Sequence, residues 1–305
     1  MVSLDAFKGI ALASTFVIAM LGGLSPLCGS RSQQAVRALP VMNAASAGVF
    51  LSAGLMHLLA DALENEVLSK RSEELWGEEG GSLIAISLCT GGFLLLVVVE
   101  QAVTACAQTN EASKTDNTLL DGKEREDIPP ADDEGDDAEE TAVSAASLAV
   151  ALVVGLGLSL HSVMEGLALG AQQDQAATAG IFFAIIAHKG IAAFALGNKT
   201  FQSIVVERDS DDGHKQKMQF ILFMALFSLM TPAGIAIGWA ATIGDTAEES
   251  PWPAAFSAVG AGTFLFVATV EVIPAELGHN SVDRGPKTAG LVVCAFLMGS
   301  LAKWA

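Results

Sequence analysis

The chain has 305 residues, about half of them apolar, and a formal net charge of −18. Apolar content this high, together with 30 glycines, is typical of helices that pack closely in lipid and excludes an ordinary soluble domain. The acidic residues are concentrated between Glu124 and Glu140, so the net charge predicts no basic partner and no nucleic acid.

The four cysteines predict neither a disulfide framework nor a thiolate metal site, because no CxxC pair occurs and three of them lie in or beside apolar runs. The first apolar run follows Lys8 and continues without a clear small-residue cleavage site. We therefore expect it to be the first membrane helix rather than a signal peptide.

Stretches of about twenty mostly apolar residues, long enough to span a bilayer as helices, recur along the chain. In order they are 7–27, 41–61, 82–104, 146–169, 178–198, 219–241, 255–277 and 288–304. The sequence thus predicts an all-α polytopic membrane protein with eight transmembrane helices, and the lipid bilayer is its first expected partner.

A polar, acidic segment divides the predicted helices into three and five. It covers 108–142, contains Pro129 and Pro130, and is too polar to form a core, so we expect a disordered cytoplasmic loop. The predicted regions are helices one to three in 1–107, the loop in 108–142, and helices four to eight in 143–305.

Lys and Arg residues in the loops and at the ends of the predicted spans are distributed unevenly across the membrane. Eleven fall on one side, against Lys8, Lys70, Arg71 and Lys303 on the other. Since the cytoplasmic side carries the excess, both termini are expected to be extracellular or lumenal. A plasma membrane location is expected, with an endomembrane as the alternative.

A weak internal echo links the second and seventh spans. Gly48-Val49-Phe50-Leu51, followed by His57, resembles Gly262-Thr263-Phe264-Leu265, followed by Glu271. These spans cross in opposite directions, which suggests an inverted repeat of helices one to three and six to eight around a central pair, a 3+2+3 arrangement. Chance similarity between two glycine-rich helices is the alternative.

Ionisable side chains inside the fourth and fifth spans need an explanation, because a charge at the bilayer centre costs about 2.5–3.5 kcal/mol. His161 and Glu165 are spaced i and i+4 on one helical face, and His188 lies near the middle of the next span. If the two helices pack through their glycines, the three side chains converge. Two imidazoles and a carboxylate suit Zn²⁺, so the sequence predicts a metal transporter.

Two neighbours of these residues can modify the site. Ser162 could add a hydroxyl ligand, although serines in membrane helices often bond their own helix carbonyls. Lys189 would repel a second divalent ion, which predicts a single metal; a plain ion pair with Glu165 or Glu100 is the alternative.

Further polar residues lie toward the ends of the second and seventh spans. His57, Asp61 and Glu64 share one helical face at the external end and could collect ions at the mouth of the pathway. Glu271, Glu276 and His279 lead toward the cytoplasmic end and could form an exit path. In each case a solvated helix end would look the same.

With these residues in view, the chain resembles the ZIP (Zrt/Irt-like protein) family of divalent metal transporters, in the branch with His-Ser-x-x-Glu-Gly followed by His-Lys-Gly. The motifs that carry the resemblance are Val99-Glu100-Gln101, Leu160 to Ala168, His188-Lys189-Gly190, Met230 to Gly234, Gly262 to Leu265 and Glu271 to Leu277.

The resemblance implies an importer that carries Zn²⁺, and in some members Fe²⁺, Mn²⁺ or Cd²⁺, into the cytosol by an elevator-like alternation of access, often as a homodimer. It places metal ligands at His161, Ser162, Glu165 and His188, and external residues at His57, Asp61 and Glu64. Many members carry an acid where this chain has Lys189, which argues against a binuclear site here. No resident cofactor is expected.

Two other functions remain open from the sequence. A proton-coupled exchanger or an efflux protein could use the same residues, because direction is not encoded in the ligands. An intramembrane zinc hydrolase would need a dedicated general base, and no HExxH motif occurs. We therefore expect a transporter and not an enzyme.

Overall fold

The computed structural model describes residues 3–29, 33–121, 134–206, 213–242, 251–278 and 283–302, nearly all of them helical. The elements are α1 (Leu4–Gly29), α2 (Gln33–Ser52), η1 (Ala53–Leu58), α3 (Leu59–Glu64), α4 (Glu66–Trp76), η2 (Glu78–Gly80), α5 (Leu83–Asp121), α6 (Glu134–Ala171), α7 (Gln175–Phe201), η4 (Gln202–Val206), α8 (Gly213–Ala241), α9 (Trp252–Phe266), η5 (Val267–Val272), α10 (Ile273–Leu277) and α11 (Arg284–Ala302).

Seven helical segments in the described part of the chain are long and apolar enough to cross a membrane. They are 4–28, 38–64, 78–105, 151–171, 175–205, 213–241 and 252–277, which coincide with the first seven predicted spans. The prediction of an all-α polytopic membrane protein is therefore confirmed. The eighth predicted span coincides with α11, which is 19 residues long but does not belong to this set.

The predicted loop at 108–142 is only partly described. Helix α5 continues to Asp121 and α6 begins at Glu134, while 122–133 lie outside the described residues. The disorder of this loop stays a prediction.

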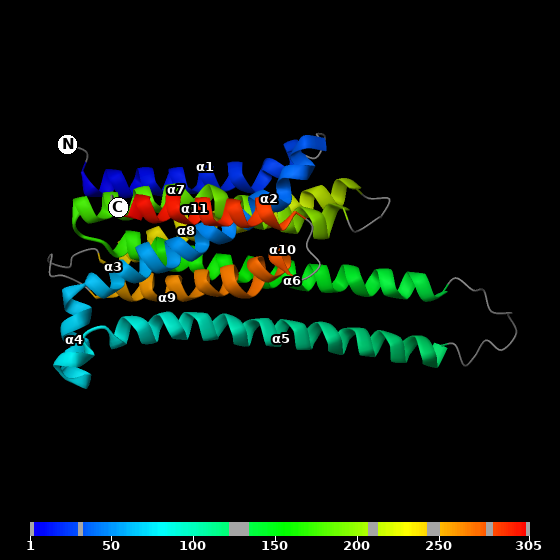
Figure 1. Cartoon of the computed structure of the whole chain (residues 1–305), viewed down its shortest axis with the longest axis horizontal. Helices are drawn as coiled ribbons and strands as arrows, with labels where there is room; N and C mark the ends of the chain where they lie inside the picture. Colours follow the sequence, from blue (N-terminus) through cyan, green and yellow to red (C-terminus); the bar gives the residue numbers. More distant parts are fainter. Residues whose placement is uncertain are drawn as a thin grey trace, which may run out of the picture.

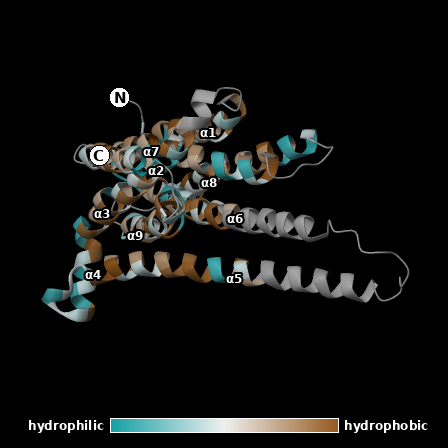
Figure 2. Ribbon diagram, turned by 45° about the vertical axis from the view of Figure 1, so that its right-hand side comes forward, coloured by the Kyte–Doolittle hydropathy of each residue, from teal (hydrophilic) through white to brown (hydrophobic). Residues whose placement is uncertain are grey.

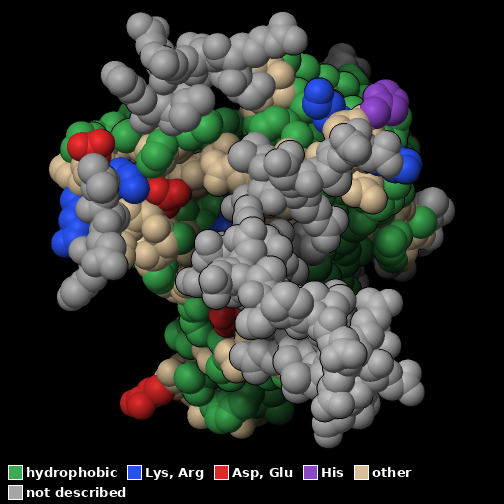
Figure 3. Space-filling view, turned by 90° about the vertical axis from the view of Figure 1, so that its right-hand side faces the viewer, with side chains coloured by type: hydrophobic (Ala, Val, Ile, Leu, Met, Phe, Trp, Pro, Cys, Tyr) green, Lys and Arg blue, Asp and Glu red, His purple; other side chains and the backbone are tan. Residues whose placement is uncertain are grey.

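The helices lie roughly side by side along one direction, with the start of α1 and the end of α11 at the same end (Figure 1). Hydrophobic residues run along the long helices, whereas the short α4 at that end is rich in hydrophilic residues (Figure 2). The opposite end, where α8 begins, displays Lys and Arg side chains together with carboxylates (Figure 3).

Packing divides the long helices into two bundles. The first bundle contains α1, α6, α7 and α8, and the second contains α2, α5, α9 and α11, with η1, α3, η5 and α10 attached to it. The main contact between the bundles runs along α6 and α9.

Glycines allow the closest approaches inside each bundle. A Cβ at Gly166 of α6 would lie 2.4 Å from the Thr231 carbonyl oxygen of α8. A Cβ at Gly197 of α7 would lie 2.2 Å from the Gly23 carbonyl oxygen of α1. In the second bundle, a Cβ at Gly262 would meet the Cys89 backbone of α5. Backbones in such contact leave no room for side chains, so each bundle is internally tight.

One packing expectation was wrong. The glycines of α6 and α7 do not bring those two helices together: Gly166 and Gly170 face α8, whereas Gly190 and Gly197 face α1. The two helices meet through their side chains instead, because α8 and α1 already occupy the small-residue faces.

Three of the membrane segments contain a short π-helix, namely η1, η4 and η5, and two of these, η1 and η5, occupy matching positions. Segment η1 begins at Ala53, five residues after Gly48, and η5 begins at Val267, five residues after Gly262. His57 and Glu271 are the fifth residues of these two segments. A single π turn inside an α-helix occurs frequently at functional sites.

Candidate metal centre

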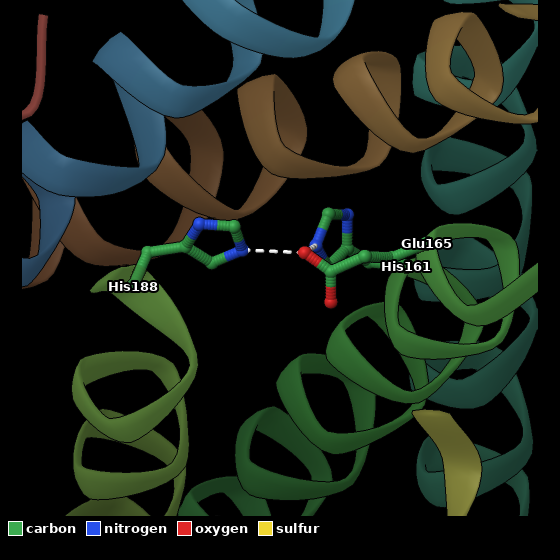
Figure 4. Close-up of side chains that lie close together, drawn as sticks. All are labelled: His161, Glu165 and His188. Carbon is green, nitrogen blue, oxygen red and sulfur yellow. Dashed lines mark hydrogen bonds and ion pairs between the residues drawn. The ribbon is translucent and has the colours of Figure 1, made fainter. Parts of the chain in front are cut away.

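His161, Glu165 and His188 form a cluster whose potential ligand atoms all lie within 4.8 Å of one another. The first two project from α6 and the third from α7, so two of the four helices of the first bundle contribute (Figure 4). All three side chains are buried. The structure therefore brings together the three residues that the sequence singled out in these spans.

The Glu165 carboxylate lies at the centre of the cluster. Its Oε1 is 2.6 Å from His188 Nε2 and 3.7 Å from His161 Nε2, and its Oε2 is 3.9 Å from Lys189 Nζ. A buried carboxylate needs such compensation, because an unpaired charge in a low-dielectric interior is strongly destabilising.

The His161 ring is held from its far side. Its Nδ1 lies 3.2 Å from the Gly260 carbonyl oxygen of α9, so Nδ1 carries the proton and donates, since a carbonyl can only accept. The Nε2 lone pair then faces Glu165. A backbone carbonyl that fixes the tautomer in this way is typical of metal-binding histidines.

Several polar atoms in the cluster have no hydrogen-bond partner among the described residues. They are His161 Nε2, Glu165 Oε2 and His188 Nδ1. Buried polar atoms are normally satisfied. The donor set thus fits a ligand that enters between the imidazoles and the carboxylate.

Phe264 of α9 covers the site and was missed by the sequence reasoning as a site residue. Its ring stacks on His161 with the ring centroids 3.4 Å apart and lies edge-on to His188 at 5.3 Å. It also stacks on Phe50 of α2. A phenylalanine in an apolar helix carries no sign of such a role, apart from its place in the motif Gly262 to Leu265.

Ser162 and Lys189 form a second polar contact beside the cluster. The Ser162 hydroxyl donates to the Leu158 carbonyl and accepts a 2.6 Å hydrogen bond from Lys189 Nζ. The ammonium also lies 5.0 Å from the centroid of the Phe227 ring. The hydroxyl is therefore already engaged by a cation, and its role as a metal ligand stays a prediction.

The residues predicted for the external mouth lie on η1 and α3. His57 is buried and its Nδ1 lies 3.2 Å from Asp61 Oδ2, while the Asp61 side chain is 42% exposed. His57 also interacts electrostatically with His188 and Glu165. Glu64 ends α3 and is exposed. These residues lead from the surface toward the cluster.

The residues predicted for the exit lie at the other end of the second bundle. Glu271 is on η5 and pairs with Lys199 of α7 at 3.6 Å, and Glu276 is on α10 and pairs with Lys287 of α11 at 3.1 Å. His279 lies outside the described residues.

Two amides at this end were missed by the sequence reasoning. Asn198 donates to Asn43 at 3.0 Å, and Asn43 donates to Glu276 at 3.0 Å. Polar amides inside predicted apolar spans are the signal that could have identified them.

Comparison with known proteins gives a consistent result over almost the whole chain. Residues 5–302 match the family described as ZIP Zinc transporter. The Homo sapiens protein Zinc transporter ZIP2 is 30% identical over 99% of this chain and 100% of its own length. Homo sapiens Zinc transporter ZIP1 is 30% identical over 88% of the chain and 82% of its own length, and the Danio rerio ZIP1 is 27% identical over 97% and 95%.

Proposed function

The chain belongs to the ZIP zinc transporter family, and from that premise we propose that it carries Zn²⁺ into the cytosol through the cluster of His161, Glu165 and His188. The observation that carries the proposal is the convergence of these three buried side chains within 4.8 Å of one another. Two imidazole nitrogens and one carboxylate oxygen match the ligands that Zn²⁺ takes at about 2.0–2.2 Å.

Zinc is the proposed main substrate, and Fe²⁺, Mn²⁺ and Cd²⁺ are candidates for the same ligands. Sites of histidine and carboxylate follow the Irving–Williams trend and select by geometry and availability. Three protein ligands also leave an open coordination position, which suits an ion that must bind and then leave.

Binding requires one proton rearrangement. In the metal-free cluster His188 Nε2 donates to Glu165, so this nitrogen must lose its proton before it can face a cation. The free ring nitrogen, Nδ1, has no partner among the described residues and can take the proton. His161 needs no such change, because its Nδ1 already donates to the Gly260 carbonyl.

We propose that the cluster holds a single ion. The Lys189 ammonium lies 3.9 Å from Glu165 and is bound to Ser162, beside the cluster. A second cation bound to Glu165 would lie close to this ammonium, and two neighbouring positive charges repel strongly in a low-dielectric interior. A second divalent cation would therefore have to displace the lysine.

Alternating access is proposed to occur by movement of one bundle against the other. The tight backbone contacts of Gly166 and Gly197 lie inside the first bundle. At the boundary, the Cβ of a residue at Gly157 would meet the side chains of Leu96 and Val267 at 3.0 Å or more. Side chains can slide and repack where interlocked backbones cannot, so the bundles are the natural rigid bodies.

The proposed topology has eight crossings, with α11 as the last, arranged 3+2+3 around α6 and α7. The matched positions of η1 and η5, with His57 and Glu271 in register, support an inverted repeat. The excess of Lys and Arg supports a cytoplasmic location for the end where α8 begins, and both termini then face outward.

The path that follows from this topology is uptake at His57, Asp61 and Glu64, transfer to the cluster, and release past Glu271 and Glu276. The exposed Asp61 carboxylate and the buried His57 support a stepwise loss of water during uptake. The homodimer and a plasma membrane location stay predictions, and no described contact bears on them.

The test is zinc uptake by proteoliposomes that contain the purified full chain and a zinc-sensitive dye. We expect saturable zinc uptake by the parent protein and none by His161→Ala. Uptake by the parent should occur only when the external side of the protein faces the added zinc. Uptake that needs a proton gradient would instead indicate an exchanger. Uptake unaffected by removal of either His161 or His188 would contradict the ligand assignment.

A further inference from the structure

A cavity of about 180 Å³ lies between the two bundles, one helical turn from the cluster of His161, Glu165 and His188, which we call the metal cluster. Leu158 of α6 and Phe50 of α2 line it. The Leu158 carbonyl accepts a hydrogen bond from the Ser162 hydroxyl. Phe50 stacks on Phe264, whose ring covers His161. On the proposed path toward Glu271 and Glu276, an ion that leaves the cluster would therefore pass beside this cavity.

The rest of the lining is mixed: Val154, Ala195, Val272 and Ala275 are apolar, whereas Asn43, Ser46, Lys199, Gln202 and Glu276 are polar. Two contacts of these polar residues connect one bundle to the other. Lys199 of α7 pairs with Glu271 of η5, and Asn198 of α7 donates to Asn43 of α2. The Lys287 to Glu276 pair is different, because α11 and α10 both belong to the second bundle.

The two carboxylates are well shielded from water. The Glu271 side chain is 8% exposed and that of Glu276 is 17% exposed. Glu100 of α5 adds a further negative charge near Glu271. Removing Lys199 from this position would leave a nearly buried carboxylate without a counter-charge, which is unfavourable. A divalent cation at the same place would supply that charge.

We propose that Lys199 and Glu271, with Asn198 and Asn43 beside them, form a latch that holds the bundles together on the exit side of the cavity. A cation that reaches the cavity opens the latch by replacing the Lys199 ammonium at the Glu271 carboxylate. Opening is thereby coupled to the presence of the ion, and the bundles separate at this end mainly when there is cargo to release. The inference rests on the proposed transport path.

The latch can be tested by the accessibility of the cavity. In a full chain whose native cysteines are replaced by serine, Ala275→Cys places a thiol in the cavity wall, and a charged thiol reagent is applied from the cytoplasmic side. We expect slow labelling without metal and labelling about five times faster with saturating Zn²⁺. In Lys199→Met the labelling should be fast with or without Zn²⁺, because the ion pair that holds the two bundles together at this end is absent.

Two matched variants separate the latch from a general loosening. Lys199→Arg keeps the cation and should restore slow, zinc-dependent labelling. Lys287→Met removes the other lysine at this end, but its pair lies within one bundle, so labelling should stay within about twofold of the parent protein. If Lys199→Met does not fold, Asn198→Ala removes the second contact of the latch, the hydrogen bond to Asn43, and should also speed up labelling without metal.

Zinc binding by the same detergent-solubilised proteins, measured by calorimetry, separates failure of the latch from failure of the proposed function. If the parent binds Zn²⁺ but its labelling rate does not respond, or if Lys199→Met labels as slowly as the parent, the latch is wrong. If the parent does not bind Zn²⁺ at all, the metal cluster is wrong, and labelling that is nevertheless fast in metal-free Lys199→Met still supports the contact between the bundles.

Discussion

The metal cluster and the exit cavity both place a carboxylate next to a lysine, yet the two pairs are built differently. Glu165 and Lys189 belong to α6 and α7 of the same bundle, and two histidines share the carboxylate. Glu271 and Lys199 come from different bundles, and the pair is closer at 3.6 Å. A pair inside one bundle can shape a binding site, whereas a pair between the bundles must break if they separate as proposed.

The first prediction asks whether the cluster alone binds the ion. His188→Ala and His161→Ala each remove one of the three proposed ligands, and we expect zinc uptake to fall by about 100-fold. Loss of a residue that only supports a metal ligand already costs up to about 100-fold, so loss of a ligand should cost at least as much. Uptake by proteoliposomes is the measurement. His214→Ala is the matched control, because His214 is near the start of α8 and outside the cluster.

A second prediction separates packing inside a bundle from packing between bundles. Gly166→Ala would push a methyl group to 2.4 Å from the Thr231 carbonyl oxygen, so we expect a loss of about 1–3 kcal/mol in stability. Gly157→Ala meets the end of the Leu96 side chain and should cost clearly less. Thermal unfolding in detergent measures both, and equal losses would argue against two rigid bundles.

A third prediction concerns the external mouth, where the carboxylate of Asp61 is partly exposed and pairs with a histidine rather than with a lysine. Asp61→Asn removes a charge that attracts cations and orients His57. We expect the KM for zinc to rise about threefold at low salt, with less effect at high salt and with kcat unchanged. A fall in kcat alone would place Asp61 in a later step.

The smallest expected effect tests the role of Lys189. In Lys189→Glu a carboxylate replaces the ammonium beside Glu165, which removes the repulsion against a second ion. Zinc binding measured by calorimetry should then change from one ion per chain to two. A stoichiometry that remains one would mean that geometry, rather than the lysine charge, limits the number of ions.

Much of the site was predictable because an ionisable side chain in a membrane segment costs free energy, so its presence points to a function. His161, Glu165 and His188 stand out in apolar spans, and the i, i+4 spacing fixes the first two on one face. The opposite was true of the exit side. The partners of Lys199, Asn43 and Asn198 are far away in the sequence, so the sequence does not show what these residues contact.

The sequence by itself determined the apolar helices and singled out the three ionisable residues of the buried cluster, since hydropathy and local spacing act within single segments. Only the tertiary structure decided which helices pack into the same bundle. The glycines of α6 and α7 pack against α8 and α1 rather than against each other, and the ring that covers His161 comes from α9. These choices depend on how surfaces from distant segments fit together, and periodicity within one helix does not encode that fit.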